Sequence, residues 1–465
     1  MPVILLILFS LILVMLIITT YHIRVVLKKN EALENEQEKT SRVQAWIYAA
    51  IVLTIVAIIT SIYFVVKGTP WEAHLMEWLN IVVRVMHITF GIAWIGASFY
   101  FVFLENALNR TENIRDELAG NLWAVHGGGF YYLEKYKVAP KTIPKHLHWF
   151  KYEAYFTWLS GIGLLFIVYY FNASAMLIDP AVMKLTTLEG IAIGIGSFIA
   201  AWCMYDLLCK SPLRKKPILF AIIGTLILIA FAWFYSQVFS GRAAFIHFGA
   251  MIGSIMVANV FFVIIPAQKA MVNAAKQGQL PDAQKGKNAL FRSIHNNYFT
   301  LPVLFVMVSN HFPGTFSHTY QWIVLAAISI GSAGIKHWLN LREQGQLSVW
   351  VMPGSVLILL AVVFATAPKA STTKCSEISF ATANAIIQQR CVSCHSSMPT
   401  DDVYKVAPNG VKYDTPQEIV AKKELILQRV VFTKSMPQNN KTNMTPEERE
   451  MIRCWIEGGA NPQTP

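Results

Sequence analysis

Cys391-Val392-Ser393-Cys394-His395 is the stretch on which the organisation of this 465-residue chain depends. Two cysteines separated by two residues and followed directly by a histidine have the spacing for covalent attachment of a c-type haem. The thiols add to the two vinyl groups of the haem, and the imidazole binds the iron from one face. A zinc ribbon would need a second Cys/His pair at similar spacing, which the sequence lacks. The motif therefore predicts haem c and one-electron chemistry.

The residues around the motif predict a small helical domain. Residues 379–390 have the pattern of a helix that leads into the attachment site. Thr415 and Thr445 each precede a proline and stand three residues before a glutamate, which is the signature of a capping box at a helix start. The last helix should end at the glycine pair 458–459. Three helices around one haem are typical of an all-α, class I-like cytochrome c, so we assign this domain to residues 369–465.

The iron needs a second axial ligand on the opposite face of the haem. Met436 precedes a proline in a predicted loop shortly before the last helix, and a thioether there would raise the reduction potential. Met398 is too close to the attachment site to reach the far face, and Met444 is the alternative to Met436. Cys375 and Cys454 flank the same region and could pair if it lies outside the cytoplasm, but the sequence alone does not decide whether they are bonded.

The composition is that of a membrane protein, because 54% of the residues are hydrophobic and only 14% are charged. Segments of about 20 apolar residues can span a bilayer as helices. The sequence offers ten such candidates, at 3–23, 45–66, 80–104, 150–171, 188–208, 217–239, 244–266, 296–311, 320–341 and 348–367. The net charge of +12 does not indicate nucleic acid as a partner, because the basic residues fall in short loops between these segments.

The basic loops predict how the chain crosses the bilayer. Loops 24–44, 105–149, 209–216 and 267–295 are rich in Lys and Arg, and all four fall on the same side of the predicted topology. The positive-inside rule makes that side the cytoplasm. The first segment lacks the features of a cleaved signal peptide and is interpreted as an anchor with its N-terminus outside. We therefore expect a multi-pass protein of the bacterial inner membrane with a periplasmic haem domain.

The membrane part divides into two regions. Residues 1–76 supply two accessory helices and a charged linker, and residues 77–368 supply a core of eight helices. The core has features of a 4+4 repeat, because a histidine near the outer end of the helix at 80–104 has a counterpart in the helix at 244–266. In each half the next helix contains Tyr-Phe-Thr, at 155–157 and at 298–300.

Those two histidines, His87 and His247, are candidate ligands of a haem b. Ionisable groups inside a bilayer are costly and usually functional. Two neutral imidazoles could hold a haem from both faces, with Arg84 and Arg242 pairing with its propionates. Alternatively, each histidine hydrogen-bonds a neighbouring helix or faces water near the interface. His74 and His311 are other possible ligands.

Polar residues at the cytoplasmic ends of the helices form a second candidate site. Amides, hydroxyls and imidazoles together could hold a planar, hydrogen-bonding substrate, and Glu153 or a histidine could act as the base. The alternative is that these side chains only anchor helix ends at the interface. The candidate catalytic residues are His126, His148, Glu153, His295, Asn297, Tyr298 and Thr300.

Four stretches resemble the bacterial membrane-bound urate oxidase (urate hydroxylase) family: Arg84–Phe101, Trp123–Tyr131, His148–Tyr155 and His295–Tyr298. The C-terminal Cys-Val-Ser-Cys-His and the Met-Pro at 436–437 resemble the cytochrome c domain fused to that family. The resemblance implies oxidation of urate to 5-hydroxyisourate without hydrogen peroxide. Electrons would pass through haem c to a soluble cytochrome c or a terminal oxidase.

Two other functions fit the residues without the resemblance. One is a membrane quinol:cytochrome c-type oxidoreductase, and the other is a permease or redox sensor with no enzymatic activity.

Urate oxidation releases two electrons, whereas one haem c accepts one. This difference favours a second redox centre in the membrane part, for which haem b is the candidate.

Overall fold

The computed structural model describes residues 46–461, apart from 48–49, 52–53, 55–56, 59–60, 62–64, 68, 145 and 368–373. The predicted anchor at 3–23 and much of the segment at 45–66 lie outside the described residues. Contacts divide the chain into two units, 1–79 and 80–465. The second unit contains the helical bundle and the C-terminal domain, and the following paragraphs concern this unit.

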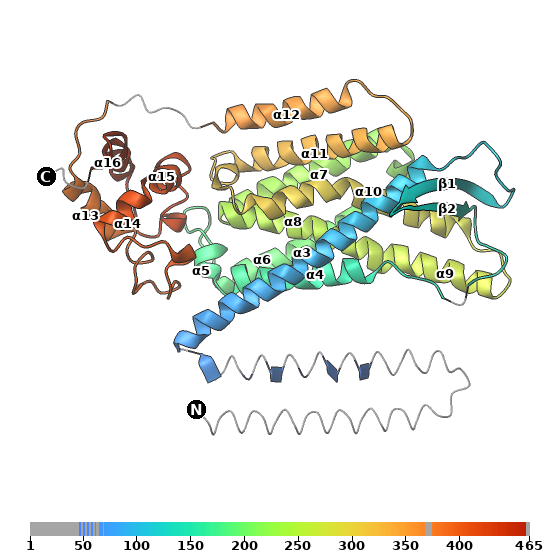
Figure 1. Ribbon diagram of the computed structural model, residues 1–465, viewed down its shortest axis with the longest axis horizontal. Coiled ribbons are helices and arrows are strands. Elements are labelled where there is room, and N and C mark those ends of the chain that lie inside the picture. Colours follow the sequence, from blue (N-terminus) through green and yellow to red (C-terminus); the bar gives the residue numbers. More distant parts are fainter. Residues whose placement is uncertain are drawn as a thin grey trace. The chain divides into compact units, whose positions relative to one another are not determined.

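The bundle consists of long helices, most of them joined by short connections (Figure 1). Helix α8 lies at its centre and packs against α4, α6, α7 and α10. Its buried face includes Phe245, Phe248 and Met251. The elements are α3 (Pro70–Ala107), α4 (Tyr152–Leu164), η1 (Leu165–Tyr170), α5 (Ala173–Met176), α6 (Thr187–Lys210), η2 (Pro212–Lys215), α7 (Pro217–Val238), α8 (Gly241–Ala258), η3 (Asn259–Ile264), α9 (Ile265–Lys276), α10 (Ala283–Ser309), η4 (Pro313–Thr315), α11 (Gln321–Glu343) and α12 (Val351–Ala365).

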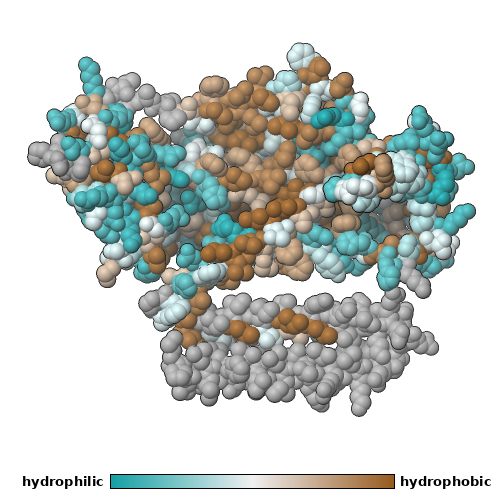
Figure 2. All heavy atoms as spheres, viewed as in Figure 1, coloured by the Kyte–Doolittle hydropathy of each residue, from teal (hydrophilic) through white to brown (hydrophobic). Residues whose placement is uncertain are grey.

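Five helical stretches of the described chain are long and apolar enough to cross a membrane: Trp71–Ala107, Thr187–Lys210, Pro217–Val238, Gly241–Lys276 and Gln321–Glu343. The protein is therefore a membrane protein with a mostly helical fold. The other predicted core segments also fall on helices, but α12 is shorter, and α10 begins well before its predicted start in a polar, basic stretch. Apolar side chains form a broad band over the middle of the bundle, with polar side chains at both ends (Figure 2).

The prediction of an all-α fold is wrong in the loop between α3 and α4. Strands β1 (Leu118–His126) and β2 (Gly129–Tyr136) form an antiparallel hairpin in which His126 pairs with Gly129. Gly127 and Gly128 have φ of 57° and 79°, as a two-residue type I′ turn requires. The stretch His126–Gly129 is therefore an ordered turn rather than a flexible loop.

The C-terminal domain contains α13 (Phe380–Arg390), η5 (Pro408–Gly410), α14 (Pro416–Ala421), α15 (Lys423–Ile426), η6 (Leu427–Phe432), η7 (Gln438–Asn440) and α16 (Pro446–Glu457). Both predicted capping boxes are confirmed, at Thr415 and Thr445. Ile387, Ile419 and Trp455 lie in its core. Local sequence signals thus set where these helices begin.

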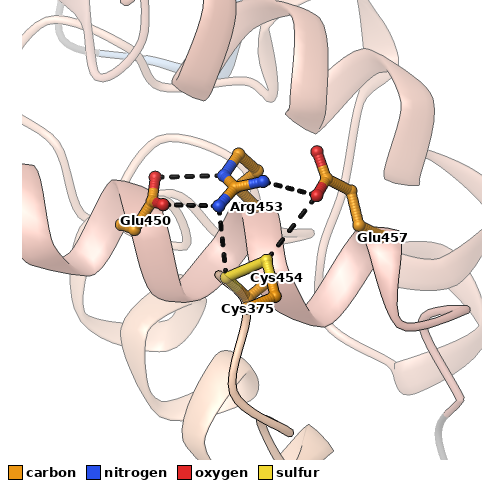
Figure 3. The surroundings of a disulfide bond; sticks show 5 residues. All are labelled: Cys375, Glu450, Arg453, Cys454 and Glu457. Atoms are coloured by element: carbon orange, nitrogen blue, oxygen red, sulfur yellow. Dashed lines mark hydrogen bonds and ion pairs between the residues drawn. A yellow bond between two sulfur atoms is a disulfide. The ribbon is translucent and has the colours of Figure 1, made fainter. Parts of the chain in front are cut away.

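Cys375 and Cys454, whose pairing the sequence left open, form a disulfide with 5.1 Å between the two Cα atoms. It ties the segment before α13 to the last helix, where Arg453 forms ion pairs with Glu450 and Glu457 (Figure 3). Disulfides persist mainly in oxidising compartments. The bond is therefore consistent with an extracytoplasmic location of this domain.

Candidate substrate and haem sites

The attachment motif follows directly on α13. Cys391 is the C-cap of the helix, and its carbonyl accepts hydrogen bonds from the N–H groups of Cys394 and His395, at 3.2 and 2.9 Å. Both thiols are free and half-buried. Nδ1 of His395 donates to the carbonyl of Val411 at 3.0 Å, which orients the ring and leaves Nε2 for a metal. These residues have the donor set and the orientation that a covalent haem c needs.

Met436 and Met444 lie in different environments. Met436 is half-buried, in a loop fixed by its N–H bond to the carbonyl of Arg429 and by Arg449, which donates to the Met436 carbonyl at 2.7 Å. Met444 is 3% exposed and packs in the domain core. A ligand must reach the iron rather than fill the core, so these environments favour Met436.

An ion pair holds the loop that follows the motif. Lys441 Nζ lies 2.7 Å from Asp401 Oδ2, and the backbone N–H groups of Val403 and Tyr404 donate to Asp401 Oδ1. Burial alone would raise the pKa of Asp401, but the bonds from Lys441 and the two N–H groups outweigh it and lower the pKa to about 2. The Asp401 carboxylate therefore stabilises this loop.

His87 contacts α4 rather than a second histidine. Its Nδ1 donates to the Thr157 carbonyl at 2.9 Å and lies 3.2 Å from Ser160 Oγ. Gly161 permits this approach, because a Cβ there would lie 2.9 Å from the ring. Arg84, one turn earlier, donates to Asn80 of its own helix.

His247 is completely buried and enclosed by aromatic rings. Its Nδ1 donates to the Ala243 carbonyl at 2.8 Å, and its Nε2 lies 3.2 Å from the Tyr170 hydroxyl. The ring of Phe239 lies 4.5 Å away, between centroids, and Arg242 lies over Phe316. A haem b on Nε2 would have to displace Tyr170, so these residues do not fit the group in this arrangement. Haem b stays a prediction, which a pyridine haemochrome assay that finds only c-type haem would refute.

Helix α10 separates two polar clusters, and the first is fully paired. Arg292 forms an ion pair with Asp206 and donates to Asn259 at 3.2 Å. Asn259 in turn donates to Asn296 and Tyr205, and the Tyr205 hydroxyl lies 2.7 Å from Nδ1 of His295. No side-chain atom of this network is among the described buried polar atoms without a partner. We call it the α6–α10 network.

The second cluster lies on a different face of α10, and we call it the α10–α11 cluster. It contains Ser98, Asn297, Lys336 and Asn340. Asn340 Nδ2 donates to Asn297 Oδ1 at 3.1 Å, and Asn297 Nδ2 lies 3.5 Å from Ser98 Oγ. Two of its atoms, Lys336 Nζ and Asn340 Oδ1, are buried with no hydrogen-bond partner among the described residues. Of the predicted residues, Asn297 therefore lies in this cluster, whereas the Thr300 hydroxyl donates to the Asn297 carbonyl of its own helix at 2.6 Å.

The other predicted residues are dispersed. His126 is exposed at the turn of the hairpin, and His148 is exposed with its ring against Phe150. The Tyr298 hydroxyl bonds Nδ1 of His337 at 2.7 Å. Glu153 Oε2 is buried without a hydrogen-bond partner among the described residues.

Sequence reasoning did not select Asn340 or Ser98 for the site. The available signal was the i, i+4 spacing of Lys336 and Asn340 in an otherwise apolar segment, which places both on one helix face. No comparable signal marked Ser98, whose role depends on how α3 packs.

The C-terminal domain contacts the turn around α5. Gln438 and Asn439 donate side-chain hydrogen bonds to the carbonyl of Ala175, at 2.6 and 3.0 Å, and Asn439 also donates to Ile178 at 2.8 Å. The same turn is held to the N-cap of α8 by Ser240, which donates to Met176 at 2.9 Å. The loop of Met436 is thus connected to the helix that carries His247.

Comparison with protein families finds that the urate oxidase N-terminal family model matches residues 73–367. No curated protein and no solved structure matches the chain. The matched region contains the whole α10–α11 cluster and the helices around it. The chain therefore belongs to the urate oxidase N-terminal family, which indicates a urate-related oxidase function.

Proposed function

We propose that this protein is a membrane-bound urate oxidase that converts urate to 5-hydroxyisourate and passes the electrons through haem c to the respiratory chain, without forming hydrogen peroxide. The observation that carries this proposal is the combination of two features in one chain. The bundle belongs to the urate oxidase N-terminal family. The domain after it has a haem attachment motif with two free thiols and a histidine, His395, whose Nε2 is available to bind a metal.

Four residues would hold the haem c. The Cys391 and Cys394 thiols would form the thioether links, Nε2 of His395 would bind one face of the iron, and the thioether of Met436 would bind the other. When bound, the haem supplies one-electron transfer. Val411 keeps the ring of His395 in orientation, and Arg449 holds the carbonyl of Met436.

The reaction balances with water as the source of oxygen. Urate and one water give 5-hydroxyisourate, two protons and two electrons, so oxygen gas is not needed as a reactant. Each electron leaves through haem c to a soluble cytochrome c or a terminal oxidase. The amides of Asn297 and Asn340 suit a planar ring rich in donors and acceptors. Glu153, whose Oε2 is buried without a hydrogen-bond partner among the described residues, stays the candidate base predicted from the sequence.

The contacts of Gln438 and Asn439 with the turn around α5 support electron transfer from the bundle to the haem c domain. They bring the loop of the proposed ligand Met436 against the membrane part. The disulfide and the distribution of basic loops support a bacterial inner-membrane location with the haem c domain in the periplasm.

Anaerobic turnover in isolated membranes tests this function. Membranes that contain the protein should consume urate without oxygen when an external cytochrome c is supplied, and Cys394→Ala membranes should not. Turnover that needs oxygen and yields peroxide would contradict the electron route. Loss of activity in quinone-free membranes would instead favour the quinol oxidoreductase.

A further inference from the structure

Lys336 is a buried cation that has no counter-charge in hydrogen-bond reach among the described residues. Lys336 of α11 is 0% exposed, and its Nζ has no hydrogen-bond partner among the described residues. Instead, Nζ lies 3.7 Å from the centre of the Phe99 ring of α3. Glu343, further along α11, uses its carboxylate to accept from Asn106. A buried ammonium with only an aromatic face as neighbour is costly, so an anion there would lower its free energy.

An unpaired acceptor lies on the same helix face. Asn340 follows Lys336 by four residues, which places the two side chains one above the other. Asn340 commits its Nδ2 to Asn297, and its Oδ1 is buried without a partner among the described residues. The α10–α11 cluster therefore offers an unsatisfied cationic donor and an unsatisfied neutral acceptor together. A single ligand that satisfies both would carry a negative charge together with an N–H or O–H donor.

The α6–α10 network contains a buried cation, Arg292, whose charge is paired and whose donors have partners. Arg292 is also buried, at 4% exposed, but it has Asp206 and Asn259 as partners. Its guanidinium therefore requires no ligand. Among the described residues of the two clusters, the unsatisfied polar atoms therefore belong to the α10–α11 cluster and not to the α6–α10 network.

We propose that Lys336 and Asn340 bind the anionic purine substrate, with the ammonium donating to substrate oxygens and Asn340 Oδ1 accepting from a ring N–H. This rests on the proposed function, because urate is a planar anion with both kinds of group. Phe99 would then border the substrate, and Asn297 would hold the Asn340 amide in orientation. Helix α3 crosses the bundle at an angle (Figure 1). Its residues Ser98 and Phe99 contact Asn297 and Lys336.

Replacing Lys336 with a neutral residue of similar length tests the proposal. Lys336→Met should raise the KM for urate about 10- to 100-fold, because one charge-assisted hydrogen bond is lost, with a smaller effect on kcat. Urate should raise the Tm of the wild-type holoprotein but not that of Lys336→Met. Lys276→Met, which removes an exposed lysine at the end of α9, is the matched control and should behave as wild type.

A second variant tests the same site without removing the lysine. Asn340→Asp places a carboxylate beside Lys336, so the internal ion pair should replace the ligand: the Tm without urate should rise, and urate binding should weaken. An unchanged KM and urate-induced Tm shift in both variants would overturn the proposal. Failure of the wild-type protein to bind or oxidise urate would instead overturn the proposed function, so the two failures are distinguishable.

Discussion

The side-chain amide of Gln438 donates a 2.6 Å hydrogen bond to the backbone carbonyl of Ala175. Gln438 stands two residues after Met436, the proposed iron ligand, and Ala175 belongs to the turn that Ser240 joins to α8. This contact joins the C-terminal domain to the helical bundle.

Removing the docking contacts should slow electron transfer without weakening substrate binding. The double variant Gln438→Ala/Asn439→Ala loses four hydrogen bonds to the α5 turn: three to backbone carbonyls, each contributing about 1 kcal/mol, and one to the sulfur of Met176. Stopped-flow reduction of haem c by urate should become at least about 10-fold slower, while the KM for urate stays within about twofold. Wild-type reduction rates in the double variant would show that these contacts do not position the domain.

Met436→Ala should abolish any methionine-to-iron absorption band and lower the reduction potential of haem c, because the thioether ligand raises it. Absorption spectroscopy and a redox titration measure both effects. Met444→Ala should keep the band but destabilise the domain by about 2–5 kcal/mol, since it leaves a cavity in the core. A band that survives in Met436→Ala and disappears in Met444→Ala would make Met444 the ligand.

Removing the disulfide should destabilise the haem c domain. Cys375 and Cys454 are 79 residues apart, and opening such a link typically costs about 2–5 kcal/mol. Thermal melts followed at the haem band should show a lower Tm for Cys375→Ala or after reduction. Cys203→Ser, which changes an exposed free cysteine of the bundle, is the control. An equal Tm for the wild type, Cys375→Ala and the reduced protein would show that the disulfide does not stabilise the domain.

Asp401 should make the haem c domain sensitive to acid. Its pKa is lowered from 3.8 to about 2, so its stabilising contribution is present above pH 4 and is lost as the pH falls through about 2. This contribution amounts to about 2 kcal/mol. Asp401→Asn should therefore lower the free energy of unfolding at neutral pH, and the difference from wild type should shrink below pH 4. If the free energies of unfolding of the wild type and Asp401→Asn differ by the same amount at every pH in this range, the Asp401 carboxylate is not the source of the acid sensitivity.

Local signals in the sequence were sufficient where structure depends on neighbours along the chain. The capping boxes at Thr415 and Thr445 and the helix before Cys391 follow from residues within one turn. The positions of Cys375 and Cys454 on either side of one domain made their pairing possible, but only the structure shows that they are bonded. The hairpin was missed because three glycines suggest flexibility. The aromatic residues flanking them, such as Trp123 and Phe130, have the β-propensity that a hairpin needs.

The candidate site could be located only in part. Adjacent residues of α10 point to different clusters, since Asn296 bonds Asn259 while Asn297 bonds Asn340. Helical periodicity places neighbours on different faces but does not say which helix covers each face. The unsatisfied atoms of Lys336 and Asn340 therefore became visible only once the tertiary packing was known.

The redox spectrum of the purified holoprotein, recorded without oxygen before and after urate is added, tests the central claim most directly. We predict that urate alone reduces the haem c and that 5-hydroxyisourate appears in step with the electrons delivered. A haem c spectrum that urate leaves oxidised, in protein that chemical reductant reduces normally, would contradict the account.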